Sequence, residues 1–366
     1  MNIGIPKERR PFEYRVGLSP SGVEILCRAG NSCYVEHDAG LGAGFSDLDY
    51  ERAGARTVYL MDEVFGRSDL LVKVQRPTQE ELEFLRPGSA LAGYLLLASA
   101  RQDKIDHLLK NEITSIAFEQ IQLADGSLPV LRPFSEVCGL MTVQIAARLL
   151  QSNLGGKGIL ISGVPGVPSA EVAIIGAGVV GTNSARAFLG LGAHVTVLDN
   201  RIDALQKIND RFPNVVTMIS TERNIERVSS YADVVVGAVL RTGERAPVLV
   251  PRNIVQKMKP RSVIIDVSID MGGCFETSRP TNHENPTFID EGVIHYCVPN
   301  IPGVIARTAT HAYVNAVIPY LLDLATMGIE KAIVESKAIE SAVNTYHGEF
   351  RHFHRLTGGG GFNGLE

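Results

Sequence analysis

The 366-residue chain carries a formal net charge of −5 and is 45% hydrophobic, with 36 glycines. This length allows two domains, and the composition is typical of folded α/β proteins rather than of disordered or fibrous chains. No basic run is present, so we expect neither nucleic acid nor a membrane as a partner. The five cysteines are scattered without metal-ligand spacing. No apolar run reaches the roughly 18 residues of a membrane span. These features predict a cytoplasmic protein without a bound metal.

Strand-like and helix-like segments alternate through residues 1–134. Ser19 and Pro20 form a suitable N-cap and first-turn pair for a helix that begins at Ser21 and ends at Gly30. The hydrophobic pattern predicts strands at Ile3–Ile5, Cys33–Glu36, Leu70–Val74, Ala90–Leu97 and Ser115–Glu119, and helices at Gln79–Leu85 and Ala100–Leu109. This rhythm favours a parallel sheet covered by helices on both faces.

A glycine-rich turn follows the next predicted strand. The apolar run Val172–Ile175 leads into Gly176-x-Gly178-x-x-Gly181, and a helical segment, Thr182–Leu191, comes after it. Gly176 permits a tight turn, Gly178 lets a pyrophosphate approach the backbone, and Gly181 allows close packing of helix on strand. The N–H groups at the start of such a helix face the phosphates. This arrangement predicts dinucleotide binding.

A carboxylate ends the strand that follows this turn. Val195–Asp199 is apolar up to its last residue, and Asp199 lies about 20 residues beyond the glycines, where an acid can bind both ribose hydroxyls. Because Asp199 would repel a 2′-phosphate, NAD is favoured over NADP. Arg201 lies near enough to weaken that preference.

The remaining pattern predicts an α/β fold with two Rossmann-like parallel-sheet domains and an interdomain cleft. Further strands are expected at Ala232–Val239, Ser262–Val267 and His295–Val298, with helices at Ser135–Gln151 and Ala306–Met327. The last helix returns to the first domain. We therefore expect a split domain of residues 1–134 and 303–350, a nucleotide-binding domain of residues 135–302, and a flexible tail of residues 351–366.

Several ordered motifs outside the glycine turn carry a family resemblance. They are Pro6-Lys-Glu8, Glu13-Tyr-Arg-Val16, Leu123-Ala-Asp-Gly-Ser-Leu-Pro129, Gly163-Val-Pro-Gly-Val167, Gly237-Ala-Val-Leu240, Asp266-Val-Ser-Ile-Asp-Met-Gly-Gly-Cys274, Ser278-Arg-Pro280 and Tyr296-Cys-Val-Pro-Asn-Ile-Pro302. Together they resemble the alanine dehydrogenase family, which includes a nicotinamide nucleotide transhydrogenase subunit. The resemblance implies an NAD-dependent oxidoreductase that acts on a small molecule, with a split substrate domain and a homohexameric assembly.

The resemblance also implies site residues. The family's cofactor contacts would fall on Ser135, Gly178, Val179, Asp199, Ser220, Val239, Leu240, Val267, Asp270, Arg279, Val298 and Asn300. Arg15 would anchor a substrate carboxylate, unless it is a solvated surface arginine. Asp270 would act as acid or base or orient a water, unless it only caps a helix. Asn300 would hydrogen-bond nicotinamide or substrate, or else simply form a turn.

The substrate side departs from the family pattern at two positions. The family's Lys-x-Lys motif reads Lys73-Val74-Gln75 here, and its Tyr-Leu-His-Leu motif reads Tyr94-Leu95-Leu96-Leu97. Gln75 supplies an amide but no charge, and Leu96 gives an apolar wall without an imidazole. Lys73 is expected on the same strand face as Gln75, but too far from the strand end to replace a lysine there. Tyr94, expected on the strand face of Leu96, is the nearest candidate for a substitute acid.

The leading hypothesis is an NAD-dependent dehydrogenase or reductase with an amino-acid-, imine- or oxo-acid-like substrate other than alanine. One alternative is an alanine dehydrogenase with an altered site, and another is an NAD-binding protein without turnover. A transhydrogenase-like subunit is disfavoured, because Asp266–Cys274 and Ser278–Pro280 follow the alanine dehydrogenase version of these motifs.

Overall fold

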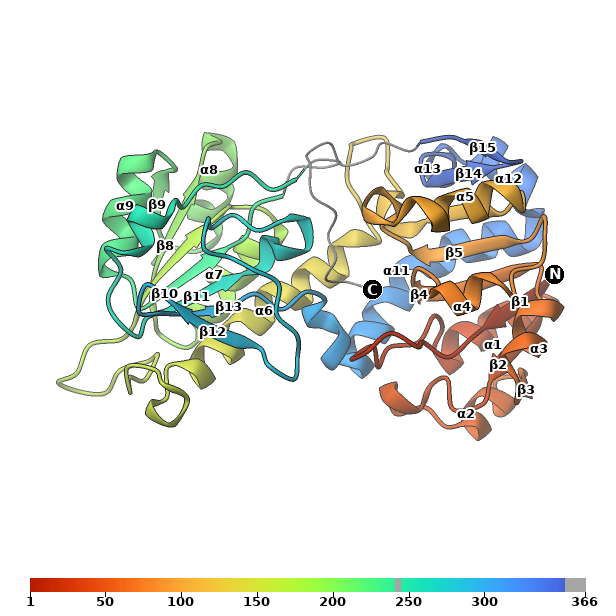
Figure 1. Cartoon of the computed structure of the whole chain (residues 1–366), viewed down its shortest axis with the longest axis horizontal. Coiled ribbons are helices and arrows are strands. Elements are labelled where there is room, and N and C mark those ends of the chain that lie inside the picture. The colour runs from red at the N-terminus through yellow and green to blue at the C-terminus, as the bar shows by residue number, and fades with distance from the viewer. Residues whose placement is uncertain (241–244, 353–366) are drawn as a thin grey trace. The chain divides into compact units, whose positions relative to one another are not determined.

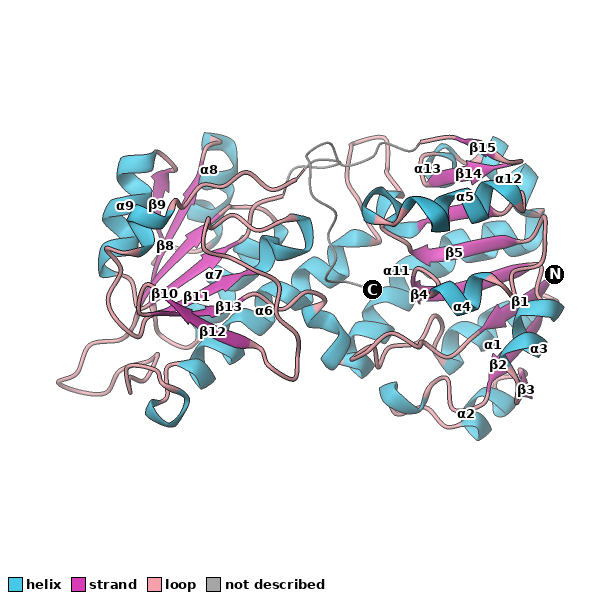
Figure 2. Cartoon of the chain, in the orientation of Figure 1, coloured by secondary structure: helices cyan, strands magenta, loops and turns pink. Residues whose placement is uncertain are grey.

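The computed structural model describes residues 1–240 and 245–352 and divides into two compact units (Figure 1). Unit 1 consists of Met1–Phe134 together with the chain from Pro302 onward, and unit 2 consists of Ser135–Ile301. Each unit has a mainly parallel sheet with helices on it, which confirms the predicted α/β class (Figure 2). Among the described residues, none of the helices is sufficiently long and apolar to cross a membrane.

Unit 1 has an eight-stranded sheet in the order β15-β14-β6-β5-β4-β1-β2-β3. The strands are β1 (Asn2–Ile5), β2 (Ser32–Glu36), β3 (Arg56–Val58), β4 (Leu70–Gln75), β5 (Ala90–Tyr94), β6 (Thr114–Ala117), β14 (Val343–Tyr346) and β15 (Glu349–Phe350). The strands β1 to β6 pair in parallel, whereas β14 and β15 extend the sheet in antiparallel fashion. Successive strands lie on one side of β1 up to β3 and on its other side from β4 onward. In open α/β sheets, ligands bind beyond the carboxyl ends of the strands at such a point.

Helices cover both faces of the unit 1 sheet. They are α1 (Pro20–Arg28), α2 (Asp47–Arg52), α3 (Met61–Arg67), α4 (Gln79–Leu82), α5 (Gln102–Lys110), α11 (Ala306–Met327), α12 (Ile329–Glu335) and α13 (Lys337–Glu340). Val23 of α1 and Val317 of α11 share one core with Val72. Phe65 of α3 and Ile105 of α5 share the other core with Leu71. Adjacent residues of β4 thus face opposite layers, as strand geometry requires.

Two predicted strands are too long. The strand expected to reach Leu97 ends at Tyr94, and Leu96 has a left-handed φ of 45°. The strand expected to reach Glu119 ends at Ala117. The Glu119 carboxylate accepts the N–H groups of Leu95 at 3.1 Å and of Leu96 at 2.7 Å. These bonds satisfy the backbone donors that would otherwise continue the sheet.

Unit 2 has a seven-stranded sheet in the order β12-β13-β11-β10-β7-β8-β9. Its strands are β7 (Glu171–Ile175), β8 (His194–Asp199), β9 (Val216–Ile219), β10 (Val234–Gly237), β11 (Val263–Asp266), β12 (Thr287–Asp290) and β13 (Val293–Tyr296). Among these strands only the edge strand β12 pairs in antiparallel fashion. Successive strands lie on one side of β7 up to β9 and on its other side from β10 onward, and in open α/β sheets ligands bind beyond the carboxyl ends of the strands at such a point.

The helices of unit 2 also lie on both sheet faces. They are α6 (Leu131–Leu149), whose first turn precedes the unit boundary, α7 (Val179–Gly190), α8 (Ile202–Arg211), α9 (Glu222–Tyr231) and α10 (Arg252–Val255). One core contains Ala146 of α6, Phe188 of α7 and Ile208 of α8. The other contains Ile225 of α9 and Ile254 of α10.

Several 3-10 turns lie between the helices and strands, and two residues of the predicted tail pair with β14. Single 3-10 turns occur at Leu41–Ala43, Leu97–Ser99, Phe118–Gln120, Ser152–Leu154, Val267–Met271 and Ile301–Val304. Of the tail predicted at residues 351–366, Arg351 and His352 donate their N–H groups to Asn344 and Val343 of β14. The rest of that predicted tail, residues 353–366, lies outside the described residues.

Candidate functional site

The turn after β7 requires glycine at two positions and leaves space at a third. Gly176 has a φ of 109°, and a Cβ there would lie 2.3 Å from the carbonyl oxygen of Ala238. A Cβ on Gly181 would lie 1.8 Å from the carbonyl oxygen of Gly176. A Cβ on Gly178 would meet nothing within 4 Å. The backbone at Gly178 is therefore accessible to a ligand, while the other two glycines hold the turn against the sheet.

Asp199, at the end of β8, is bonded directly to this turn. Its Oδ2 accepts the N–H of Ala177 at 2.7 Å, and its Oδ1 accepts the N–H of Arg201 at 2.9 Å. The Arg201 guanidinium is 3.9 Å from the same carboxylate and is 62% exposed. Ser220 donates its N–H to the Asp199 carbonyl. The glycine turn after β7, Asp199 at the end of β8 and Ser220 after β9 therefore lie along one edge of the sheet.

Asp270 and Asn300 are brought together from the loops after two different strands, β11 and β13. Asp270 lies in the 3-10 turn after β11, and its Oδ1 accepts the N–H of Asn300 at 3.2 Å. Asn300 has a φ of 56°, an uncommon conformation outside glycine. Val239, after β10, donates its N–H to the Ser268 hydroxyl at 2.9 Å. These contacts join the loops after three neighbouring strands.

The other residues predicted to contact the cofactor differ in how far they are exposed. Leu240 is 55% exposed, whereas Val298 is 1% exposed and packs in a core, so only its backbone is available to a ligand. Val267 and Ser135 are half-buried. The Arg279 guanidinium stacks 4.3 Å above the Phe288 ring.

Asp266 was not predicted as a site residue, yet it organises the loop that carries Asp270. Its buried carboxylate accepts the N–H groups of Ser268 at 3.0 Å and Cys274 at 2.9 Å, and the Ser278 hydroxyl at 2.7 Å. Burial raises the pKa of Asp266, although these donors oppose the rise. In the sequence, the feature that marks Asp266 is its place as an acidic residue at the end of an apolar strand.

Arg15 in unit 1 is not a surface residue. It is 4% exposed, so the alternative of a solvated arginine is wrong. Its Nε lies 2.7 Å from Glu13 Oε1 and its Nη2 lies 2.5 Å from Glu13 Oε2. Its guanidinium also lies 4.5 Å above the Phe134 ring. Burial is the largest single effect and lowers the pKa of Arg15, but the charge and hydrogen bonds of Glu13 together with the charges of Glu8 and Tyr94 outweigh it, and the pKa rises.

Gln75 and Tyr94 lie next to this ion pair. The Gln75 amide donates to Glu13 Oε2 at 2.6 Å. Tyr94 is the register partner of Gln75 on the neighbouring strand, and its ring meets the edge of Phe134 at 5.2 Å. Arg15, Gln75 and Tyr94 are therefore gathered at the carboxyl ends of β4 and β5, beside Glu13, which sequence reasoning did not single out.

Lys73 is fully buried and held by two acids. Its Nζ lies 2.7 Å from Glu81 Oε1 and 3.2 Å from Glu8 Oε2. The register between β4 and β5 shifts between Val72 and Gln75, which interrupts the simple alternation that placed Lys73 on the face of Gln75. The two side chains bind different carboxylates, since Lys73 contacts Glu8 and Glu81 whereas Gln75 donates to Glu13.

Leu96 is half-buried and lies in a turn rather than in a strand. The prediction that it shares a strand face with Tyr94 is wrong, because the strand ends at Tyr94. Arg76 Nη1 donates to the Leu96 carbonyl at 3.2 Å, and the Glu119 carboxylate accepts the Leu96 N–H. Burial raises the pKa of Glu119 to about 7 despite these donors.

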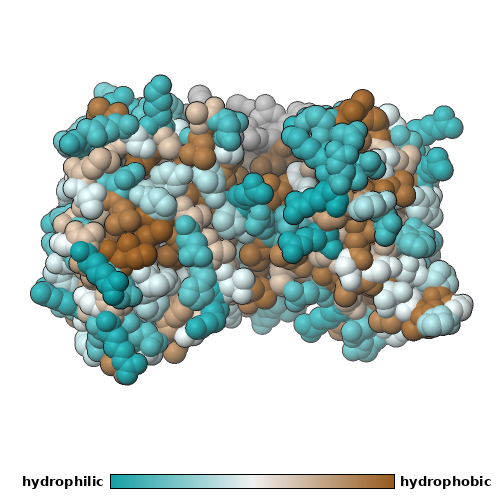
Figure 3. Space-filling model, turned by 180° about the vertical axis from the view of Figure 1, so that it is seen from behind, coloured by the Kyte–Doolittle hydropathy of each residue, from teal (hydrophilic) through white to brown (hydrophobic). Residues whose placement is uncertain are grey.

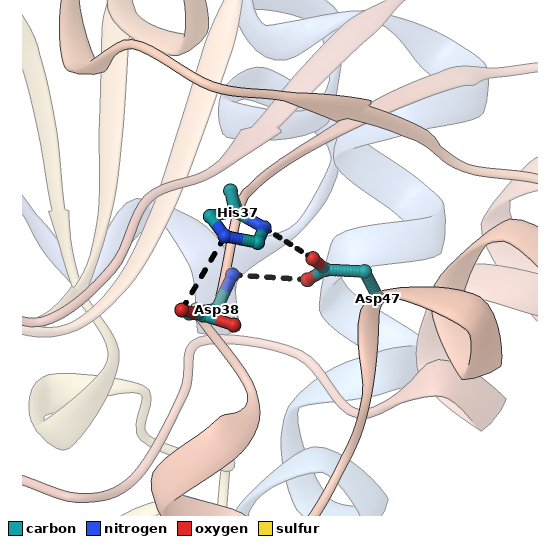
Figure 4. Close-up of side chains that lie close together, drawn as sticks. All are labelled: His37, Asp38 and Asp47. Carbon is teal, nitrogen blue, oxygen red and sulfur yellow. Dashed lines mark hydrogen bonds and ion pairs between the residues drawn. The ribbon is translucent and has the colours of Figure 1, made fainter.

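Within the described part of the chain, one group of side chains has the composition of a metal site. His37, Asp38 and Asp47 present ligand atoms within 4.8 Å of one another (Figure 4). His37 Nδ1 lies 2.5 Å from Asp47 Oδ2, and the Asp38 N–H donates to Asp47 Oδ1 at 2.9 Å. These bonds account for the arrangement as a turn before α2, and we assign no metal to it.

Comparison with known proteins decides the family. The family model described as "Alanine dehydrogenase/PNT, N-terminal domain" matches residues 4–138, and the corresponding C-terminal domain model matches residues 142–353. The chain belongs to the alanine dehydrogenase/PNT family. The predicted resemblance is confirmed, and the chain is an oxidoreductase of this family.

Individual relatives agree with this assignment. The chain is 45% identical to an alanine dehydrogenase of Methanococcus maripaludis over 351 residues, covering 95% of this chain and 94% of the relative. It is 46% identical to alanine dehydrogenase 2 of Staphylococcus aureus, with the same coverage of both chains. A solved L-alanine dehydrogenase superposes with a TM-score of 0.93 at 41% identity, over 96% of this chain and 97% of the other. A transhydrogenase from Sinorhizobium meliloti, at 24% identity and a TM-score of 0.82 over 96% and 99% of the two chains, supports the fold alone.

Proposed function

We propose that the chain binds NAD on unit 2 and transfers hydride between it and a small substrate that is not alanine. The observation that carries the nucleotide proposal is the contact between Asp199 and the glycine turn. That carboxylate, fixed beside the accessible backbone of Gly178, suits a ribose whose pyrophosphate rests on the start of α7. The α7 N-cap is Gly178 itself, so no side chain caps this end.

The loops after β10, β11 and β13 would hold the rest of the cofactor. Ser135, Ser220, Val239, Leu240, Val267, Arg279 and Val298 are proposed contacts by family resemblance. NAD supplies the hydride chemistry when bound. Asp270 would hold or move a proton, directly or through water. Asn300 would position a polar group, because its backbone is fixed to the Asp270 carboxylate.

We propose that the substrate differs from alanine because Gln75 and Leu96 stand where family members have lysine and histidine. Loss of a general acid or base typically lowers a rate by about 10²–10⁴. Loss of a charge-assisted hydrogen bond to the substrate adds roughly 1.5–3 kcal/mol. Alanine–pyruvate turnover is therefore expected to be weak or absent. Ordinary alanine dehydrogenase rates would overturn this proposal and favour an alanine dehydrogenase with an altered site.

The cluster of Arg15, Gln75 and Tyr94 is the proposed substrate site of unit 1. Arg15 is buried and rigidly paired, Gln75 offers an amide, and Tyr94 offers a hydroxyl at a neighbouring strand end. Tyr94 is the proposed substitute acid, because Leu96 has no ionisable group and Lys73 is held by Glu8 and Glu81.

The experiment is a spectrophotometric assay of NADH oxidation by the full chain. The panel contains oxo acids with ammonia or simple amines, and cyclic imines, with pyruvate plus ammonia as the reference. Consumption of NADH with at least one member other than pyruvate is the expected result. Tight NADH binding without turnover of any member would favour the alternative of a nucleotide-binding protein.

We also propose self-association, a hexamer by family resemblance. Apolar residues gather in patches on the face seen in Figure 3. Exposed apolar side chains include Ile25 of α1 at 42% and Val334 of α12 at 81%. Light scattering coupled to gel filtration measures the mass of the assembly, and a monomer would contradict the proposal.

A further inference from the structure

One buried carboxylate fixes both ends of the loop that follows β11. Asp266, the last residue of that strand, is 1% exposed. Its Oδ1 accepts the N–H of Ser268 at 3.0 Å. Its Oδ2 accepts the N–H of Cys274 at 2.9 Å and the hydroxyl of Ser278 at 2.7 Å. The chain from Ser268 to Cys274, which contains Asp270, is therefore held at its start and at its end by the same side chain.

Two glycines leave the space that this carboxylate occupies. A Cβ on Gly273, whose φ is 83°, would lie 2.8 Å from Asp266 Oδ2. A Cβ on Gly237, the last residue of β10, would lie 3.0 Å from Asp266 Oδ1 and 2.5 Å from Cys274 Sγ. A larger residue at either position would have to displace these groups. The acid and the two glycines thus form one closely packed unit at the carboxyl ends of β10 and β11.

The loop held by Asp266 is bonded in turn to the loops on either side of it. Ser268 Oγ accepts the N–H of Val239, which follows β10, at 2.9 Å. Asp270 Oδ1 accepts the N–H of Asn300, which follows β13, at 3.2 Å. Because β11 lies between β10 and β13 in the sheet, the three loops are neighbours. A change at Asp266 therefore reaches both adjacent loops through the loop after β11.

The hydrogen bonds of Asp266 lie on one side of the point at which the strand order changes side. The glycine turn after β7 and Asp199 at the end of β8 lie on the other side of that point. A dinucleotide binds across such a point. With its ADP-ribose half on the glycine turn and Asp199, its nicotinamide half would lie over the loops after β10, β11 and β13.

We propose that Asp266 is a positioning residue for the nicotinamide half of NAD, acting through the backbone of Ser268 and the loop that carries Asp270. The inference rests on the proposed binding of NAD to unit 2. It assigns the two halves of the cofactor to separate parts of that unit. The glycine turn and Asp199 bind ADP-ribose, whereas the loops fixed by Asp266 receive the nicotinamide. Asp266 itself is too deeply buried to contact the cofactor.

The first test compares NADH with ADP-ribose, which lacks the nicotinamide half, by calorimetric titration of the full chain. Asp266→Asn keeps the size of the side chain but replaces one oxygen by an amino group, which accepts no hydrogen bond. The dissociation constant of NADH should rise by about tenfold or more, the scale of a charge-assisted hydrogen bond, while that of ADP-ribose stays unchanged. Equal weakening of both ligands, or no weakening of NADH, would overturn the inference.

Asp233→Asn is the matched control, because it makes the same change at the opposite ends of the strands. Asp233 directly precedes β10 and is 6% exposed. Its carboxylate accepts the N–H of Glu171 at 3.0 Å and pairs with Lys157. The ratio of the two dissociation constants should remain that of the wild type. A shift as large as that of Asp266→Asn would contradict a specific role for Asp266.

Ser268→Ala tests the route and decides the matter if Asp266→Asn does not fold. It removes the hydroxyl that accepts the Val239 N–H and leaves the Asp266 carboxylate in place. NADH binding should weaken several-fold and ADP-ribose binding should not change. In the double variant the loss of NADH affinity should be smaller than the product of the single losses, because both changes act through Ser268. Unchanged NADH binding in Ser268→Ala, or fully multiplicative losses, would overturn the inference.

The wild-type chain separates this inference from the proposed function. The expected result is tighter binding of NADH than of ADP-ribose. If the wild type binds neither ligand, the proposed NAD site is contradicted and the inference falls with it. If it binds both equally tightly, NAD binding stands, and the role of Asp266 alone is overturned because the nicotinamide half then contributes nothing to affinity.

Discussion

Asp199 Oδ2 accepts the N–H of Ala177 at 2.7 Å, which fixes the acid at the end of β8 against the glycine turn after β7. The same carboxylate accepts the N–H of Arg201 through its other oxygen. One side chain therefore sets the shape of the turn and provides the negative charge beside it. This coupling makes the nucleotide proposal testable at single residues.

Asp199→Ala should weaken NADH binding by roughly 10- to 100-fold, because a charged acceptor for the ribose hydroxyls is lost. NADPH binding should fall less, or rise, since the repulsion of a 2′-phosphate is removed. Fluorescence titration of both nucleotides measures the effect. Asp203→Ala, on the exposed start of α8, is the control and should bind NADH as the wild type does. Equal losses for NADH and NADPH would contradict the assigned role.

Gly181→Ala and Gly190→Ala form a matched pair within α7. A Cβ at Gly181 would lie 1.8 Å from the Gly176 carbonyl oxygen, whereas a Cβ at Gly190 would meet nothing within 4 Å. Gly181→Ala should lower the free energy of unfolding by about 1–3 kcal/mol or more and impair NADH binding. Gly190→Ala should be neutral or stabilising by up to about 1 kcal/mol. Urea unfolding distinguishes them, and similar behaviour of both variants would contradict the close-packing argument.

Lys73→Met should destabilise the chain by about 3–5 kcal/mol, because it leaves Glu8 and Glu81 buried without their shared cation. The control is Lys207→Met, whose ammonium is 81% exposed in a surface pair with Asp203. That change should cost less than about 1 kcal/mol. Urea unfolding midpoints measure both. A Lys73→Met variant as stable as the control would show that the buried ion network contributes little.

Glu119 gives unit 1 a predicted pH dependence of stability. Burial raises its pKa from 4.5 to about 7 in the folded chain. Between these values the folded state binds a proton that the unfolded state has released, so the free energy of unfolding falls as the pH rises. The full effect is about 3 kcal/mol and is complete above the folded pKa.

Glu119→Gln cannot titrate and should remove this part of the pH dependence. Relative to the wild type, the variant should therefore gain stability as the pH rises from 4.5 toward about 7. Unfolding measured across this range provides the comparison. Glu80→Gln, on an exposed position of α4, should follow the wild type. Parallel curves for the wild type and Glu119→Gln would be incompatible with a raised pKa.

The features that sequence analysis predicted well depend on local chain geometry. The helix Ala306–Met327 has the same bounds in the structure, and the Ser19 hydroxyl caps α1 at the Gly22 N–H. The glycine spacing and the strand-ending Asp199 likewise follow from positions along a single βαβ unit. Each of these signals lies within a short stretch of chain, where spacing and residue type determine the structure.

The features that sequence analysis missed depend on contacts between distant segments. Glu119 binds the N–H groups of Leu95 and Leu96 directly after β5 ends at Tyr94, although the run Leu95–Leu97 continues the apolar pattern. Glu13 belongs to one of the motifs that carry the family resemblance, but its hydrogen bond with Gln75 joins residues that are 62 positions apart in sequence. Hydrophobic periodicity carries no information on which carboxylates will meet inside the fold.

Titration of the wild-type full chain with NADH and NADPH tests the central claim most directly. The account predicts saturable NADH binding at least about tenfold tighter than NADPH binding, a difference of about 1.4 kcal/mol. Absence of NADH binding, or tighter binding of NADPH, would contradict the assignment of Asp199 and the glycine turn as an NAD site.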